Sequence, residues 1–261
     1  MNPVSKPQSV DISDCHFYHS IDIDNQEHKG EWDLRKSIPE YLGSVDLTDK
    51  SVLECGPANG VISNYLENNC KSFSVLDLDT SLEWDVVPFE NVQEDRIVNM
   101  KKHLQQIQNA FWYNYIKRNS NYDVYHSNLY NADKIDEKFE VSLLGAILIH
   151  VRDPLLALEK VSKVTEKTLV ITEFYPKPTL KMKILFKLGY SFDQLIKYAP
   201  DTPVFTPHPD KPKENFSWWS LPPKFLISYL KILGFNQFTT KASTHLYMDK
   251  PIHMYTLIAN R

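Results

Sequence analysis

Glycine is used sparingly in this sequence, and two of its glycines lie close together. The chain has 7 glycines among 261 residues, where average usage would give about 18. Gly56 and Gly60 enclose the segment Pro57-Ala58-Asn59, which follows a strand-like stretch at 51–55 and precedes a helix-like stretch at 61–69. Backbone without Cβ atoms can approach a ligand closely, and amides at the start of a helix can face a polar or anionic group. We therefore expect a binding site at this loop.

An aspartate follows the loop at a spacing that suits a nucleoside site. A second strand-like stretch, 73–77, ends in Asp77, 17 residues after Gly60, and a carboxylate there can accept both hydroxyls of a ribose. The dinucleotide pattern G-x-G-x-x-G falls on Gly56, Ala58 and Val61, so its third position fails. The phosphate-loop pattern G-x-x-x-x-G-K-[ST] does not occur. These features predict a cofactor that contains a nucleoside.

The elements that must position these residues alternate along the chain from residue 51. Strand-like stretches lie at 51–55, 73–77, 123–126, 139–149 and 168–173, and helix-like stretches lie at 61–69, 96–118 and 154–164. In the second helix the apolar residues recur at spacings of three or four. Alternation of this kind predicts a mostly parallel sheet with helices on both faces.

The alternation breaks at Pro176. Nine of the 16 prolines lie between 176 and 223, and we expect one helix near 180–197 in this segment. A long connection of this kind is often a lid or a substrate loop. After it, a helix at 223–233 is ended by Gly234, and strands at 235–241 and 253–259 are expected to pair as an antiparallel hairpin.

The loop resembles a known cofactor motif. The pattern Glu54-x-Gly56-x-Ala58-x-Gly60 resembles motif I of class I S-adenosylmethionine-dependent methyltransferases, usually (D/E)-x-G-x-G-x-G. Residues 139–154 resemble the family's fourth strand and the turn after it. The late stretch 219–235 resembles the branch related to tRNA wobble-uridine methyltransferases. The resemblance covers roughly residues 17–260. It implies a Rossmann-like α/β fold: a seven-stranded, mostly parallel sheet with a C-terminal antiparallel hairpin and helices on both faces.

The resemblance also implies S-adenosyl-L-methionine as the cofactor and assigns residues to it. Glu54 would orient the loop near the methionine amino group, and Asp77 would hold the ribose hydroxyls. Arg35 could pair with the methionine carboxylate, because a guanidinium recognises carboxylates in a bidentate way; its alternative is a surface charge. The remaining implied contacts are the backbone of Gly56, Ala58 and Gly60, the adenine neighbours Leu78, Asn128 and Leu129, and, beside the methionine portion, Gly145 and Ala146.

Three titratable residues are candidates for removing a proton from the acceptor or for positioning it. Methyl transfer from a sulfonium is an in-line displacement, in which positioning can supply most of the rate, and a base is needed only if the acceptor carries a proton at the working pH. His150 follows the fourth strand and could act as the base or orient the acceptor, or it could simply support the turn. His19 is a second candidate base. Glu173 ends the fifth strand and could contact a cationic or hydroxyl group.

Aromatic residues are candidates for the substrate pocket. We assign Tyr18, in a cap segment over residues 1–50, and Trp112, Trp218 and Trp219, in the methyltransferase domain over 51–261, to this role. Segments near 96–118 and 176–220 would act as inserted lids. For the 96–118 helix, ordinary core packing is the favoured alternative because its apolar spacing is helical. The two consecutive tryptophans favour a pocket.

The composition of the chain limits the classes of partner that we expect. The net charge of −4 and the pI near 6.1 disfavour a nucleic acid, and the longest apolar run, 141–149, is too short to span a membrane. Three cysteines without metal spacing fit a reducing, cytoplasmic compartment. His16 and His19 have no third ligand in reach by sequence, so no metal is expected. We predict methylation of an oxygen or nitrogen on a small-molecule acceptor, with a homodimer left open. The alternatives are a tRNA-modifying methyltransferase and a non-catalytic binding subunit.

Overall fold

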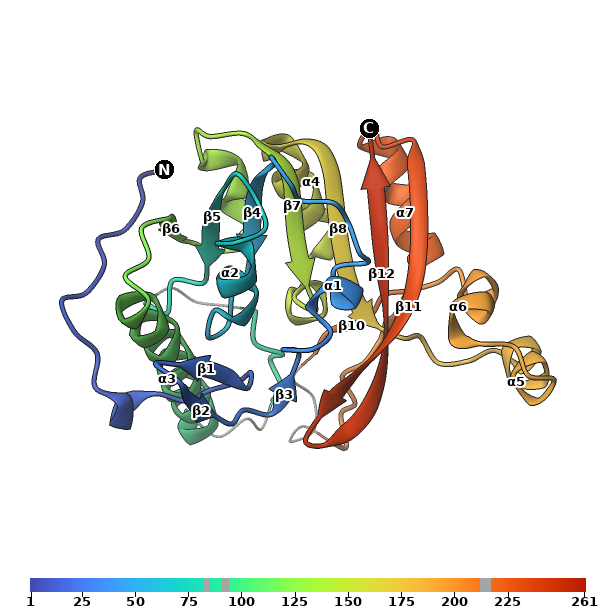
Figure 1. Ribbon diagram of the computed structural model, residues 1–261. Coiled ribbons are helices and arrows are strands. Elements are labelled where there is room, and N and C mark those ends of the chain that lie inside the picture. The colour runs from blue at the N-terminus through green and yellow to red at the C-terminus, as the bar shows by residue number, and fades with distance from the viewer. Residues whose placement is uncertain (82–84, 91–93, 212–216) are drawn as a thin grey trace.

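A single eight-stranded sheet forms the centre of the protein (Figure 1). The computed structural model describes residues 1–81, 85–90, 94–211 and 217–261. In spatial order the strands of the sheet are β3 (Trp32–Asp33), β11 (Gln237–Tyr247), β12 (Lys250–Asn260), β8 (Thr165–Phe174), β7 (Phe139–Gly145), β4 (Ser51–Cys55), β5 (Ser72–Asp77) and β6 (Asp123–His126). The pairs from β8 to β6 are parallel, whereas β12 pairs with β8 and β11 in antiparallel fashion. The predicted fold class is therefore confirmed, and β3 adds an eighth strand to the seven that were predicted.

Helices cover both faces of this sheet (Figure 1). The helices are α1 (Ile38–Tyr41), α2 (Val61–Leu66), α3 (Glu94–Lys117), α4 (Pro154–Val164), α5 (Leu180–Lys187), α6 (Phe192–Leu195) and α7 (Pro223–Ile232). The 3₁₀-helices are η1 (Ile12–Asp14), η2 (Leu129–Lys134), η3 (Leu148–His150) and η4 (Ile196–Tyr198), and two small sheets pair β1 (Ile21–Ile23) with β2 (Gln26–His28) and β9 (Val204–Phe205) with β10 (Trp219–Ser220). No helix in the described ranges is long and apolar enough to cross a bilayer.

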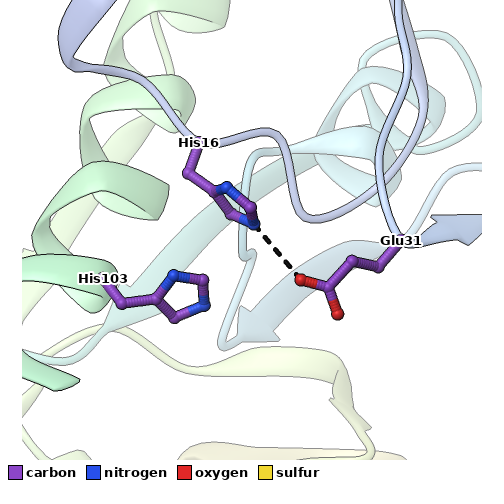
Figure 2. A group of neighbouring side chains, drawn as sticks. All are labelled: His16, Glu31 and His103. Carbon is purple, nitrogen blue, oxygen red and sulfur yellow. Dashed lines mark hydrogen bonds and ion pairs between the residues drawn. The ribbon is translucent and has the colours of Figure 1, made fainter. Parts of the chain in front are cut away.

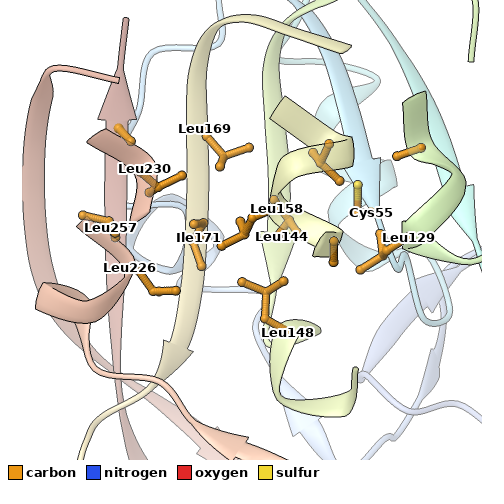
Figure 3. Packing of buried hydrophobic residues seen from close by; sticks show 14 of the residues in the cluster. Cys55, Leu129, Leu144, Leu148, Leu158, Leu169, Ile171, Leu226, Leu230 and Leu257 are labelled. Carbon is orange, nitrogen blue, oxygen red and sulfur yellow. The ribbon is translucent and has the colours of Figure 1, made fainter. Parts of the chain in front are cut away.

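The central strands are apolar on both sides because both sides are covered. Successive residues of a strand point to opposite faces. Leu144 and Ile171 accordingly join the cluster under α4 and α7 (Figure 3), while their neighbours Leu143 and Val170 join the cluster on the other face. Buried parallel strands read as nearly continuous apolar runs for this reason, which is why β7 and β8 were recognisable in the sequence.

The C-terminal hairpin is longer than predicted. Its strands meet at a two-residue turn in which Met248 and Asp249 have φ of 49° and 59°, as a type I′ turn requires. The tip of β11 also pairs with β3, so that Tyr247 lies opposite Trp32. Neither the outer part of β11 nor its pairing with β3 was predicted. The outer part of β11 is half-exposed and polar, and β3 is only two residues long, so neither gives a clear strand pattern.

Helix α3 is the crossover between β5 and β6. Its residues Phe111, Trp112 and Tyr115 are buried in the core. The helix predicted at 96–118 therefore exists, but its aromatic face packs on the sheet and does not form an inserted lid. The helical spacing that predicted the element also fixed this face as core.

The segment after β8 contains two helices where one was predicted at 180–197. Gly189, with a φ of +88°, follows α5, and the Ser191 side chain caps α6. Helix α6 packs against the outer strand β11 (Figure 1), whereas β9 and β10 lie beside η3 near the strand ends. Within the described part of the predicted 176–220 lid, the stretch around β9 and β10 borders the cavity described below, and residues 212–216 lie outside the described ranges. The strand predicted at 139–149 ends at Gly145, because Ala146 has a φ of +51°.

Candidate functional site

The glycine loop between β4 and α2 is held in shape by the protein itself. Gly56, Ala58 and Gly60 have φ of +75°, +51° and +85°, a region that favours glycine. A Cβ at Gly56 would lie 2.4 Å from Cδ1 of Ile147, and one at Gly60 would lie 2.8 Å from Nδ2 of Asn114. The positive φ favours glycine at both positions, and an added Cβ would also displace the side chains of Ile147 and Asn114. Ala58 shows that the central position tolerates a Cβ.

Asn59 ties the N-terminal segment to this loop. Its side chain is fully buried; Oδ1 accepts a hydrogen bond from the amide of His19 (2.8 Å), and Nδ2 donates to the carbonyl oxygen of His19 (2.9 Å). The His19 ring lies in the interior, where burial lowers its pKa to about 4. His19 is thus neutral at pH 7 and only a weak base. The role of Asn59 was not predicted from the sequence, although its position between the two loop glycines could have indicated it.

Glu54, at the end of β4, keeps one carboxylate oxygen unpaired. Oε2 accepts a hydrogen bond from Oγ of Ser63 at 2.6 Å, while Oε1 is buried without a partner among the described residues. Burial raises the pKa of this carboxyl group to about 8. An unsatisfied buried acceptor is costly, so this oxygen is suited to a hydrogen-bond donor or a cation on a ligand.

Asp77, at the end of the neighbouring strand β5, is oriented by two donors. Oδ1 accepts from the amide of Leu78 (2.8 Å), and Oδ2 accepts from Nε2 of Gln108 on α3 (3.2 Å). Gln108 also donates to the carbonyl oxygen of Leu78 at 3.0 Å. Burial raises the pKa of Asp77. Gln108 was missed in the sequence, where its signal was a glutamine on the apolar face of the helix, three residues before Phe111.

The residues assigned to adenine and to the methionine carboxylate have other partners in this structure. Asn128 caps η2, its Oδ1 accepting from the amide of Tyr130 at 2.7 Å, and Leu129 is buried in the core. The Arg35 guanidinium contacts three carboxylates, those of Asp33, Asp22 and Glu27, at 2.7–3.0 Å. A cofactor carboxylate would have to displace one of them, so the alternative assignment of Arg35 as a surface charge describes the structure better.

A cavity of about 190 Å³ opens beside the end of β8. Its lining residues are Ile149, Glu173, Phe174, Thr206, Ser217, Trp219, Ser220 and Leu221. Neither carboxylate oxygen of Glu173 has a hydrogen-bond partner of normal geometry in the described part of the chain. Burial raises the pKa of Glu173 to about 8, and the nearby amides of Leu148 and Ile149 act in the opposite direction. Glu173 is therefore mostly protonated at pH 7.

Tyr41 lies near the carboxyl groups of both Glu54 and Glu173. A Cβ at Gly145 would lie 2.7 Å from the hydroxyl oxygen of Tyr41, which places this hydroxyl over the end of β7. Burial raises the pKa of Tyr41, and Glu173 and Glu54 are close enough to raise it further. The carbonyl oxygen of Tyr41 accepts a hydrogen bond from Thr172 at 2.6 Å, which fixes α1 on the sheet. Tyr41 carried no recognisable signal in the sequence.

Of the aromatic residues that were predicted to contact the acceptor substrate, one lines the cavity and the others pack or form hydrogen bonds within the protein. Trp219 lines the cavity and donates from Nε1 to the carbonyl oxygen of Arg152 (2.9 Å). Trp218 is buried and donates to the carbonyl oxygen of Asp85 (2.8 Å), and Trp112 is core. The Tyr18 hydroxyl accepts from Nε1 of Trp32 at 3.1 Å.

His150 is exposed at the end of η3 and is not among the residues that line the cavity. Its predicted role as the base therefore has no support in this geometry. The expectation that no metal is bound rested on His16 and His19; the structure instead places His16 beside Glu31 and His103 (Figure 2).

Comparisons with known proteins agree with this architecture. No protein-family model matches the sequence, and no curated protein matches it. The crystal structure of the N-terminal domain of EvdMO1, in the presence of SAH and D-fucose, is similar over 94% of this chain and 91% of that chain, with 13% identity and a TM-score of 0.51. Magnesium protoporphyrin IX methyltransferase (ChlM) from Synechocystis PCC 6803 matches over 87% and 81%, with 14% identity and a TM-score of 0.47. Together with the strand order, the first similarity shows that the chain has the class I methyltransferase fold.

Proposed function

We propose that this protein is an S-adenosylmethionine-dependent methyltransferase that acts on an oxygen or nitrogen of a small molecule. The observation that carries the proposal is the pair of carboxylates at neighbouring strand ends: Glu54 with an unpaired buried oxygen, and Asp77 held in place by Gln108. In this fold, ligands bind outside the carboxyl ends of the strands. Glu54 would receive the methionine ammonium group, whose positive charge favours the ionised form of the carboxyl group, and Asp77 would receive the ribose hydroxyls. The similar EvdMO1 structure is described as determined in the presence of SAH.

The cavity beside Glu173 is the proposed acceptor site. It lies at the end of β8, one strand beyond β7 and on the opposite side of β7 from the glycine loop, with the Tyr41 hydroxyl between the two sites. The cofactor supplies an electrophilic methyl group. When its carboxyl group is ionised, Glu173 would take up the proton that the acceptor's oxygen or nitrogen releases on methylation. A protonated Glu173 can instead donate a hydrogen bond that positions the acceptor.

The size and polarity of the cavity favour a small acceptor. A volume of about 190 Å³ is below the range of roughly 300–1,000 Å³ typical of drug-sized ligands. It accommodates a ring or a short functional arm, and its walls combine aromatic surface with the hydroxyls of Thr206 and Ser217. The net charge of −4 gives no general attraction for a polyanion. These features rank a small-molecule acceptor above tRNA.

Calorimetry with S-adenosylhomocysteine tests the cofactor assignment. The wild-type protein is expected to bind one equivalent. Asp77→Ala should weaken binding at least 100-fold, because two charge-assisted hydrogen bonds of about 1.5–3 kcal/mol each are lost. Asp123→Ala, at the exposed start of β6, is the matched control and should bind normally. Unchanged affinity in Asp77→Ala would contradict the assignment.

Transfer of labelled methyl groups tests the acceptor class. The protein is incubated with labelled S-adenosylmethionine and either total RNA or a small-molecule extract, and the label is followed by chromatography. Incorporation into a small molecule, abolished in Asp77→Ala, supports the proposal. Incorporation into tRNA alone would overturn the ranking of acceptors while leaving the cofactor assignment intact.

A further inference from the structure

Away from the proposed cofactor and acceptor sites, two histidines and a glutamate meet from three separate segments. His16 belongs to the N-terminal segment, Glu31 directly precedes β3, and His103 lies on α3 (Figure 2). One possible ligand atom from each residue lies within 4.8 Å of the other two. Nε2 of His16 is 3.3 Å from Oε1 of Glu31, and the ring centroids of His16 and His103 are 4.6 Å apart.

Neighbouring elements hold two of these residues in place. The amide of His16 donates to the carbonyl oxygen of Gln106 on α3 (2.9 Å), so the segment that carries His16 is fastened beside His103. Glu31 is held from the hairpin: the Tyr247 hydroxyl donates to Oε2 at 3.2 Å, which leaves Oε1 facing His16. Outer contacts of this kind orient ligands in metal sites.

We propose that His16, Glu31 and His103 bind a divalent transition-metal ion of the Zn²⁺ type. Two imidazoles and one carboxylate form a donor set known for zinc, with a fourth position left to water. Mg²⁺ and Ca²⁺ prefer oxygen ligands throughout, so they fit this group poorly. Ligands about 2.0–2.1 Å from a tetrahedral metal lie roughly 3.3 Å apart, the separation already present between His16 and Glu31. His103 is exposed and can adjust its rotamer to complete the site.

The electrostatic setting is compatible with a metal. An imidazole binds a metal ion in its neutral form, so the two histidines add no charge to the site. Glu31 supplies the negative charge that a divalent ion favours.

A metal here would link the N-terminal segment to α3. His16 lies three residues before His19, whose backbone is bonded to Asn59 of the glycine loop. His103 lies five residues before Gln108, which contacts Asp77. A bound ion would therefore link the N-terminal segment to α3, the helix that carries the hydrogen-bond donor to Asp77. We expect the ion to raise the free energy of unfolding.

Metal binding is tested on the full chain without an affinity tag and stripped of metal. Zn²⁺ is titrated by calorimetry, and Co²⁺ is titrated by visible absorption spectroscopy. We expect one equivalent of each ion, with Co²⁺ bands typical of four-coordination. Tm should rise by about 5–10 °C at a hundredfold excess of Zn²⁺ over Kd. No binding, or binding with no rise in Tm, would overturn the proposal.

Variants locate the ion. His103→Ala and Glu31→Gln should each weaken Zn²⁺ binding at least tenfold, whereas His208→Ala, an exposed histidine of the proline-rich segment, should bind as the wild type does. His103 is exposed on a helix surface, so its variant should fold, and its metal-free Tm provides the check. Wild-type affinity in both ligand variants, or an equal loss in His208→Ala, would place the ion elsewhere and contradict the assignment.

Discussion

Replacing Glu173 by glutamine should change how stability depends on pH. In the folded protein, burial raises the pKa of this carboxyl group to about 8 from an ordinary value of 4.5. The folded state therefore holds the proton while the unfolded chain releases it, and each pH unit between these values costs the wild type about 1.4 kcal/mol of stability. Between pH 5 and pH 8 the free energy of unfolding should fall by about 3–4 kcal/mol through this group alone. Glu173→Gln cannot ionise and removes that loss.

Urea denaturation at pH 5, 6, 7 and 8 measures the effect. The difference in the free energy of unfolding between Glu173→Gln and the wild type should grow in favour of the variant as the pH rises, by about 3–4 kcal/mol between pH 5 and pH 8. Glu140→Gln is the matched control. Lys167 lowers the pKa of the partly buried Glu140, so Glu140 stays ionised across this pH range, and its variant should differ from the wild type by a nearly constant free energy between pH 5 and pH 8. Parallel pH profiles for Glu173→Gln and the wild type would refute the reasoning.

Two further predictions concern the contacts around the site. Gly145→Ala should destabilise the protein by about 1–3 kcal/mol through overpacking against Tyr41, and adding Tyr41→Phe should recover most of that loss, because the hydroxyl oxygen is the nearest atom at 2.7 Å; purely additive losses in urea denaturation would assign the cost to another cause. Asn59→Ala should cost about 2–4 kcal/mol by leaving the backbone amide and carbonyl of His19 unpaired. Hydrogen exchange at the His19 amide should then accelerate, and unchanged protection would show that the link is not what holds the cap.

The sequence predicted those parts of the fold that depend on local pattern. The five parallel strands, α4 and the C-terminal hairpin follow from apolar runs, a proline at the first turn of a helix and two amphipathic stretches. Strand β3 could not be predicted, because two residues carry no periodicity and its partner in the sheet, the tip of β11, lies far away in the sequence. The outer half of β11 was missed for a related reason, since it is stabilised by pairing along both edges near its tip.

The candidate site divides in the same way. Glu54, Asp77 and the loop glycines are contiguous with strand ends and could be selected by spacing. Tyr41 and Gln108 reach the site from other elements, so only tertiary structure shows that they meet it. Arg35 and His150 were selected for the chemistry of their side chains, and the fold engages the first with three carboxylates and leaves the second exposed. Chemistry that depends on neighbours close in sequence was predictable, and chemistry that depends on long-range contacts was not.

The most direct test of the proposed site is a crystal structure of the protein with S-adenosylhomocysteine. The proposal predicts the ligand's amino group within hydrogen-bond distance of Oε1 of Glu54, its ribose hydroxyls on Asp77, and its sulfur facing the end of β7 near the Tyr41 hydroxyl. Density for the ligand away from Glu54 and Asp77, or no binding at saturating concentration, would contradict it.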